Sequence, residues 1–253
     1  MRALGPHPAN SWQVDAGCAD LVRRPVPPQP LHSDALPKPV TIDLARTALL
    51  VVDMQNDFCH PAGWLASIGV DIAPACAPVA PLARLLPRLR RAGVPVVWVN
   101  WGTRPDRLNV SPLLRHVYDP AGTGHGLGDA LPGTGHPVLQ AGSWSAQVVD
   151  GLQQDPGDIR VDKHRMSGFW DTPLDSILRN LGVATLLFAG VNLDQCVLHT
   201  MADASFLGYD TLLLEDCAAT TNPAFCRDAT LLNIRQIFGF TLLSTHLMEG
   251  LPA

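Results

Sequence analysis

Three residues whose side chains suit acyl transfer, Asp53, Lys163 and Cys196, lie at or just beyond segments predicted to form strands. A cysteine attacks a carbonyl carbon as its thiolate, and a free thiol with a pKa near ~8.5 is mostly protonated at neutral pH. We expect the ammonium of a nearby lysine to lower the thiol pKa. A carboxylate can accept the thiol proton and later return it to a leaving amine. Together these side chains predict nucleophilic attack on an amide-like carbon.

Each of the three residues also has a plainer explanation when it is taken alone. Asp53 could cap a helix, Lys163 could be a solvated charge, and Cys196 could be a small buried apolar residue. Their shared position favours chemistry, because functional groups of parallel α/β sheets gather beyond the carboxyl ends of the strands. Residues 190–195 are also expected to open a helix, whose N–H groups would stabilise a thiolate and an oxyanion.

The elements that must position these residues alternate between apolar runs and helical patterns from Thr41 onward. Strands are predicted for residues 47–53, 94–100, 158–162, 184–189, 209–215 and 241–244. Helices are predicted for residues 74–92, 145–152, 172–182, 194–207 and 222–238. This alternation predicts a parallel sheet with helices on both faces. Residues 101–143 are rich in Gly and Pro, and a connection of that length is typically functional or an insertion.

The composition excludes several classes of protein. Of 253 residues, 47% are hydrophobic and 16% are charged, which excludes a disordered chain. The formal net charge of −5, without a basic stripe, argues against nucleic acid as the main partner. No apolar run of about 18 residues is present, so no membrane span is expected. Because residues 1–39 lack the apolar segment of a secretory signal, we expect a cytoplasmic protein.

Residues 1–40 are predicted to form a proline-rich arm, and residues 41–253 the catalytic domain. The arm carries eight of the chain's 23 prolines, so we expect neither a helix nor a central strand within it. Two alternatives stay open for the arm, which either packs on the domain or a neighbouring subunit, or is a mobile tail. The six cysteines contain no C-x-x-C pair, so neither a disulfide framework nor a structural zinc site is expected.

The chain resembles the isochorismatase-like cysteine hydrolases over about residues 41–250. The resemblance is carried by three segments: Ala48–Phe58, Asp162–Phe169 and Gly190–Val197. It implies a three-layer αβα fold, similar to a Rossmann fold, with a mostly parallel six-stranded sheet. It also implies an Asp–Lys–Cys triad at Asp53, Lys163 and Cys196. A cis peptide between Val191 and Asn192 is implied as well, with the N–H groups of Asn192 and Cys196 forming an oxyanion hole.

Within that family the pattern is similar to the ureidoacrylate and biuret-type amidohydrolases, in residues 142–144, 167–178 and 233–239. This similarity implies hydrolysis of a C–N bond in a small ureido, carbamoyl or carboxamide substrate through a cysteine thioester, with release of ammonia or an amine. It also implies a homo-oligomer, either a dimer or a tetramer. The chain departs from the pattern at Asn192, at Gln195 and in residues 101–112, so the acyl group that it accepts stays open.

Side chains on the predicted site loops are candidates for binding the substrate. Aromatic residues could wall a small apolar pocket, polar residues of the nucleophile turn could contact the substrate, and an arginine could hold a substrate carboxylate. These candidates are Phe58, Trp101, Trp144, Phe169, Trp170, Asn192, Gln195 and Arg104, with Arg107 as a second arginine. Ordinary aromatic packing and solvated loop arginines are the alternatives for these residues.

Two other activities of the family are alternatives. An isochorismatase-type vinyl-ether hydrolase needs an acid but no thiol, so the presence of Cys196 disfavours it. A nicotinamidase-like amidase would carry metal ligands in an Asp-x-His motif after the second strand, and residues 102–106 read Gly-Thr-Arg-Pro-Asp instead. We therefore expect no metal and no cofactor.

Overall fold

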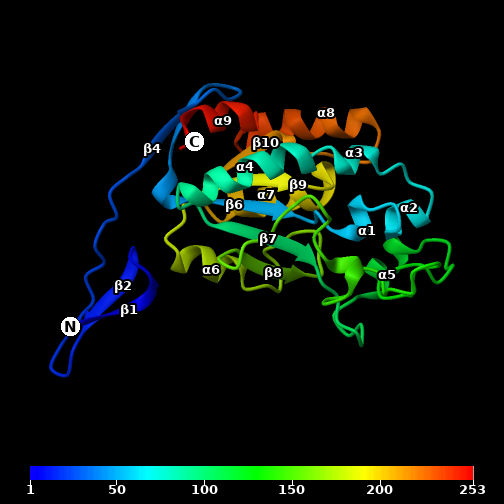
Figure 1. The fold of residues 1–253 in the computed structure, drawn as a ribbon, viewed down its shortest axis with the longest axis horizontal. Helices are drawn as coiled ribbons and strands as arrows, with labels where there is room; N and C mark the ends of the chain where they lie inside the picture. Colours follow the sequence, from blue (N-terminus) through cyan, green and yellow to red (C-terminus); the bar gives the residue numbers. More distant parts are fainter. Residues whose placement is uncertain (253) are drawn as a thin grey trace.

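The centre of the fold is a six-stranded parallel sheet (Figure 1). The computed structural model of the chain describes residues 1–252. Within them the central strands lie in the order β11-β10-β9-β6-β7-β8, and every neighbouring pair is parallel. These strands are β6 (Thr47–Val52), β7 (Val96–Trp101), β8 (Ile159–Lys163), β9 (Thr185–Gly190), β10 (Asp210–Ala218) and β11 (Phe240–Leu242). The predicted α/β class is confirmed.

The apolar runs of the sequence form the middle of this sheet. Every residue of β6 and β9 is buried, as in strands covered on both faces by helices. The helices are α1 (Asn56–Cys59), α2 (Trp64–Ser67), α3 (Ala73–Cys76), α4 (Val79–Arg91), α5 (Pro112–Tyr118), α6 (Leu174–Asn180), α7 (Leu198–Phe206), α8 (Ala224–Asn233) and α9 (Ser244–Gly250). The connections β6 to β7 and β9 to β10 run in opposite directions along the sheet, so right-handed crossovers place α4 and α7 on opposite faces. None of these helices is long and apolar enough to cross a membrane.

Two details of the predicted elements are wrong. Residues 145–152 form no α-helix, and only a short 3-10 turn, η2 (Trp144–Ala146), is present there. The backbone of this segment pairs with the loop after β6, through Asn56 N–H to the Gln147 carbonyl and Val149 N–H to the Met54 carbonyl. The helix predicted for residues 74–92 is divided into α3 and α4.

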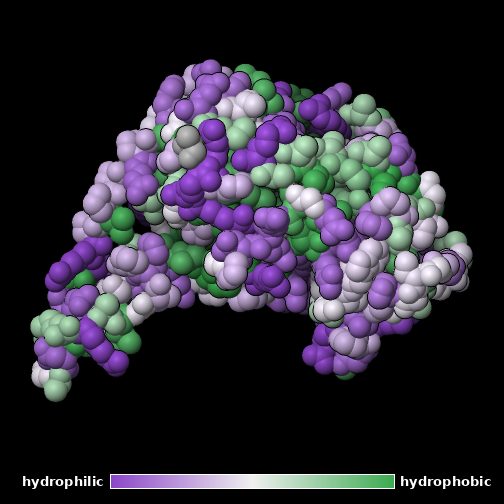
Figure 2. Space-filling view, in the orientation of Figure 1, coloured by the Kyte–Doolittle hydropathy of each residue, from purple (hydrophilic) through white to green (hydrophobic). Residues whose placement is uncertain are grey.

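The N-terminal arm has more structure than the sequence predicts. Residues 1–20 form a small antiparallel sheet of β1 (Arg2–His7), β2 (Asn10–Val14) and β3 (Ala19–Asp20), which projects from the body of the molecule (Figures 1 and 2). Because residues 9–24 lack proline, this stretch can supply the N–H groups that strand pairing needs. Beyond it, β4 (Pro30–Ser33) pairs with β5 (Val40–Asp43).

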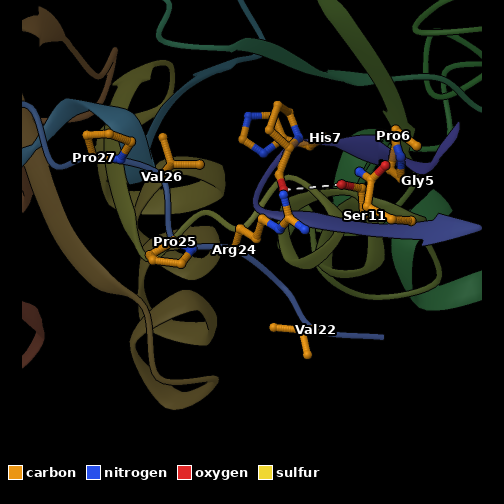
Figure 3. A pocket seen from close by; sticks show the side chains of 12 residues that line it. Gly5, Pro6, His7, Ser11, Val22, Arg24, Pro25, Val26 and Pro27 are labelled. Atoms are coloured by element: carbon orange, nitrogen blue, oxygen red, sulfur yellow. Dashed lines mark hydrogen bonds between the residues drawn. The ribbon is translucent and has the colours of Figure 1, made fainter. Parts of the chain in front are cut away.

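A hollow of about 470 Å³ lies between the β1–β2 hairpin and residues 22–27 (Figure 3). Its lining is mostly apolar, and Pro25, Val26 and Pro27 lie along one side. Within the hairpin itself, the Ser11 hydroxyl donates to the Pro8 carbonyl at 3.3 Å. The arm leaves the body at the end of the sheet away from α1, α2 and α5 (Figure 1).

Candidate active site

The residue that follows β6, Asp53, lies at a sharp turn of the chain. Its φ of 53° is in the left-handed region, which aspartate tolerates better than most residues. Its carboxylate is completely buried, and Oδ1 accepts the N–H of Trp101 at 3.0 Å. Its other oxygen, Oδ2, lies 2.9 Å from Nζ of Lys163.

Lys163 is the last residue of β8, and its ammonium group is buried as completely as the carboxylate that it faces. Besides Asp53, Nζ donates to Sγ of Cys196 at 3.2 Å and to the carbonyl of Arg165 at 3.2 Å. It also lies 4.1 Å from the centre of the Trp101 ring. A buried ammonium is tolerated only when its charge is paired and its three donors have partners, and this site supplies both.

Cys196 lies in the π-helical turn η3 (Leu193–Val197), which runs directly into α7. The turn follows β9 closely because Gly190 has a φ of 113°, and a Cβ atom there would collide with the Val52 carbonyl of β6. The peptide bond between Val191 and Asn192 is cis. Within residues 1–252, the N–H group of Asn192, directly before this turn, makes no hydrogen bond to a protein acceptor.

The sheet topology explains why residues so far apart in the sequence meet. The order β9-β6-β7-β8 places β6 beside β9, where the chain changes its direction of travel across the sheet. Crevices for ligands in open α/β sheets form at this switch point, beyond the carboxyl ends of the strands. The structure therefore brings Asp53, Lys163 and Cys196 together in one buried cluster, as their positions at strand ends predict.

Burial controls the pKa values in this cluster. Burial raises the pKa of the Cys196 thiol to about 12, although the Lys163 ammonium acts in the opposite direction. The expected lowering by the ammonium is present, but desolvation outweighs it, so the pKa of the thiol in the free protein is raised. Burial also raises the pKa of Asp53, against the lowering effect of Lys163. A proton that passes from the thiol to Asp53 leaves the net charge of the cluster unchanged, and this transfer is the inexpensive route to a thiolate in a buried site.

The residues after Asp53 hold the surrounding loops in place, a role that the sequence reasoning missed. Gln55 is buried, with Nε2 donating to the carbonyls of Trp101 and Ala146 and Oε1 accepting the Trp101 N–H. Asp57 is also buried and accepts the N–H groups of Trp64 at 3.1 Å and Leu139 at 2.7 Å. Their position directly after a buried strand is the feature of the sequence that could have predicted this role.

A cavity of about 220 Å³ lies next to the cluster. Its lining residues are Phe58, Trp64, Leu65, Val70, Val117, Tyr118, Met166, Asn192, Gln195, Thr221 and Asn222. The sulfur of Met166 is 3.8 Å from Sγ of Cys196, so the cavity approaches the thiol. The side chains of Val117 and Tyr118 come from α5, in the long segment between β7 and β8. The cavity is large enough for a small molecule only.

Of the predicted substrate-binding residues, Phe58, Asn192 and Gln195 line this cavity. Trp101 does not line it; its fully buried ring lies against Lys163 and edge-on to Tyr118.

The other predicted substrate-binding residues make contacts elsewhere. Trp144 stacks on His136, and Phe169 packs on Tyr209. The Trp170 side chain is 61% exposed and donates to an aspartate of α7.

Both candidate arginines are paired with carboxylates. The exposed Arg104 is paired with Asp106, and Arg107 with Asp129 at 2.7 Å. Neither arginine is among the residues of the cavity lining.

Several residues of the cavity wall were not predicted. Trp64 and Tyr118 stack on each other with ring centres 5.0 Å apart and form much of one side. Thr221 and Asn222 come from the loop between β10 and α8. The position of this loop beyond a strand end could have predicted that it borders the site. Nothing in the sequence, by contrast, indicates that α2 and α5 meet. Among residues 1–252, no three His, Cys, Asp or Glu side chains gather in a way that could hold a metal ion.

Comparisons with known proteins support the family resemblance. A family model described as "Isochorismatase domain" matches residues 47–246. Ureidoacrylate amidohydrolase RutB of Methylobacterium radiotolerans is 35% identical over 212 residues, which cover 81% of this chain and 80% of that protein.

Two solved structures add to this support. A cysteine hydrolase from Pseudomonas syringae pv. phaseolicola has a TM-score of 0.70 at 26% identity and covers 82% of this chain and 93% of its own. N-carbamoylsarcosine amidase from Thermoplasma acidophilum has a TM-score of 0.60 at 28% identity, with coverage of 79% and 96%.

Proposed function

The chain belongs to the isochorismatase family, and from this premise we propose that it is a cysteine amidohydrolase that cleaves the C–N bond of a small ureido, carbamoyl or carboxamide substrate. One observation carries the proposal. A buried ammonium, Nζ of Lys163, contacts both a carboxylate oxygen of Asp53 at 2.9 Å and the sulfur of Cys196 at 3.2 Å. This arrangement suits a nucleophile, a proton acceptor and a charge that holds them together. The names of two relatives, an amidohydrolase and an amidase, support the same reaction class.

In the first half of the reaction, Asp53 takes the proton of the Cys196 thiol and the sulfur attacks the carbonyl carbon. The N–H groups of Asn192 and Cys196 donate to the oxygen that becomes negative, and such donors contribute about 3 kcal/mol each in other enzymes. The protonated Asp53 then gives its proton to the leaving nitrogen. The C–N bond breaks, ammonia or an amine departs, and the acyl group stays on sulfur as a thioester.

In the second half, water replaces the amine. Asp53 takes a proton from the water, and the water oxygen attacks the thioester carbon. The C–S bond then breaks. The sulfur leaves as thiolate and regains a proton from Asp53, which restores the starting state. The balance is one amide bond and one water consumed, and one acid and one amine released. Throughout, Lys163 keeps a positive charge beside whichever of Asp53 and Cys196 is negative, which limits the cost of charge in a buried site.

Release of ammonia by the purified protein tests this proposal. The substrates are ureidoacrylate, biuret, N-carbamoyl amino acids, nicotinamide and simple aliphatic amides. Turnover of at least one ureido or amide compound, lost in Cys196→Ser and kept in Cys226→Ser, is the expected result. The second variant controls for the removal of a thiol outside the cluster. No turnover of any compound in the panel, or turnover that persists in Cys196→Ser, would contradict the proposal.

We further propose that the protein is a cytoplasmic homo-oligomer, either a dimer or a tetramer. In this assembly residues 1–40 form an arm and residues 41–253 form the catalytic domain, whose last residue lies outside the described part. The arm projects from the body and exposes Leu4, Leu21 and Val22, which supports packing on a second copy of the chain. Light scattering of the full chain and of a chain without residues 1–28 tests this role. An unchanged oligomeric state in the shortened chain would contradict it.

A further inference from the structure

The cavity beside Cys196 is uncharged. Among residues 1–252, the side chains that line it include no Lys, Arg, Asp or Glu. A substrate carboxylate placed there would lose its hydration without gaining a counter-ion, and an unpaired buried carboxylate costs several kcal/mol or more. The composition of the lining therefore bears directly on the charge of the substrate.

Four cations close to the site in the sequence are already paired, and Arg115 on α5, which has no carboxylate partner within residues 1–252, does not line the cavity. Lys163 is fully buried, and its three donors are used by Asp53, Cys196 and the Arg165 carbonyl. The guanidinium of Arg165 pairs with Asp171 at 2.6 Å. Arg104 and Arg107, which the sequence offers for a substrate carboxylate, also have carboxylate partners of their own.

The polar part of the lining consists of neutral amide and hydroxyl groups. Asn192 directly precedes the nucleophile turn and Gln195 lies within it. Oδ1 of Asn192 accepts the Thr221 N–H at 3.3 Å, and within residues 1–252 the Gln195 side chain has no hydrogen-bond partner. Asn222 lies beside this turn, with its Nδ2 donating to Asp194 at 2.7 Å. Primary amide side chains pair well with an amide or urea, which has the same kinds of donor and acceptor. The carboxylate of Asp194 behind Asn222 adds a negative charge close to this wall.

The remaining wall is apolar and aromatic. Phe58 and Trp64 meet edge to face with ring centres 6.5 Å apart, and the Trp64 ring stacks on Tyr118. Leu65 and Val70 complete this side. Such a surface gains free energy by covering an apolar group of the substrate.

We propose that the site takes an uncharged amide or urea that bears a compact apolar group, and that it discriminates against substrates with a carboxylate. This inference rests on the proposed amidohydrolase function and narrows its substrate class. The reactive carbonyl would lie at Cys196, its amide groups against Asn192 and Gln195, and its apolar group against Phe58 and Trp64.

Two pairs of matched compounds test the inference. The first pair is 3-ureidopropionate and isopentylurea, and the second is succinamate and 4-methylpentanamide. Within each pair, two methyl groups replace the two carboxylate oxygens, so shape is kept and charge is removed. Binding is measured by calorimetry with the Cys196→Ser protein, which separates recognition from turnover. We expect the neutral member of at least one pair to bind about 100-fold more tightly than its carboxylate partner.

A charge added at the rim of the cavity gives a second test. Val117 lines the cavity on α5 and is 51% exposed, so an arginine there can reach the cavity without disturbing the core. In Val117→Arg we expect the preference for the neutral compound to fall at least about tenfold, because the guanidinium pairs with the carboxylate. Leu113→Arg is the matched control, since Leu113 is 72% exposed on the same helix and does not line the cavity. It should leave the preference unchanged.

The outcomes separate this inference from the proposed function. Equal or tighter binding of the carboxylate members, or no binding of either neutral member, would overturn the inference. Ammonia release from carboxylate substrates by the unmodified protein, together with tighter binding of those substrates, would leave the amidohydrolase function standing while the substrate class fails. Preferential binding of neutral compounds without any ammonia release by the unmodified protein would support the recognition and contradict the function.

Discussion

The buried cluster and the cavity beside it are neighbours with opposite physical character. In the cluster, the side chains of Asp53 and Lys163 are fully buried and form an ion pair at 2.9 Å. In the cavity, the lining is neutral and its free polar groups are amides and hydroxyls. The two regions also differ in origin. The cluster uses three side chains at or beyond strand ends, whereas the cavity draws on α1, α2, α5, η3 and the loops that follow α2, β8, β9 and β10.

This difference indicates that the cluster determines the reaction and that the cavity determines the substrate. Charges in a dry site must be balanced, so few arrangements of the cluster are possible and each member is hard to replace. A neutral cavity obeys no such constraint, because its apolar and amide residues can be exchanged at a cost of about 1–3 kcal/mol each. We therefore expect substitutions in the cluster to remove the reaction and substitutions in the cavity to change its substrate.

The largest effect is expected for removal of the nucleophile. Cys196→Ala should lower kcat by at least about 10⁴-fold, because no other group can form the thioester. Its thermal midpoint should change little, since alanine removes one sulfur atom. Ammonia release and thermal unfolding of the same preparation measure both effects. Residual activity above about 1% would show that the reaction does not pass through this sulfur.

Loss of the buried cation should affect both activity and stability. In Lys163→Met the carboxylate of Asp53 is left buried without its partner, so we expect about 3–5 kcal/mol less free energy of unfolding and a kcat lower by about 10³-fold. Urea denaturation and ammonia release provide the measurements. The double variant Asp53→Asn, Lys163→Met should recover part of the stability and none of the activity. Equal stability of the single variant and the unmodified protein would contradict the balanced-charge description of the cluster.

The raised pKa of Cys196 predicts slow alkylation of the free protein. Its pKa of about 12 means that little thiolate is present at pH 7, and the higher nucleophilicity of that thiolate offsets only part of the loss. Iodoacetamide should therefore modify Cys196 about 10²-fold more slowly than the exposed Cys18. Because thiolate increases as the proton is lost, the rate at Cys196 should rise about tenfold per pH unit as long as the fold persists. Peptide mass spectrometry separates the two sites, and faster reaction at Cys196 would show a thiolate in the resting protein.

A smaller effect is expected in the cavity wall. Trp64→Ala removes a ring that stacks on Tyr118, so KM should rise about 10- to 50-fold while kcat changes less than about fivefold. Trp170→Ala is the matched control, because this tryptophan is exposed and does not line the cavity. Steady-state kinetics on one neutral substrate measure both variants. If Trp64→Ala lowered kcat and left KM unchanged, the assignment of substrate recognition to the cavity and of the reaction to the cluster would be contradicted.

The strands of the central sheet were predictable because each is an apolar run with polar residues at its end. The run of residues 47–52 is buried on both faces, and such runs have few other places in a fold. Residues 145–152 were not predictable as irregular structure. Their backbone pairs with Met54 and Asn56, a contact across about 90 residues that overrides local helical preference.

The sequence by itself determined which residues could react and at which edge of the sheet they lie. Asp53, Lys163 and Cys196 each lie at or beyond the end of a strand, and parallel strands bring their carboxyl ends to one edge. Only the tertiary structure decided the pKa of the thiol and the charge of the cavity. Both depend on how much water is excluded around Cys196 and on which side chains face it. That exclusion comes from packing of Tyr118, Met166 and Trp64, which lie on segments that no local pattern joins.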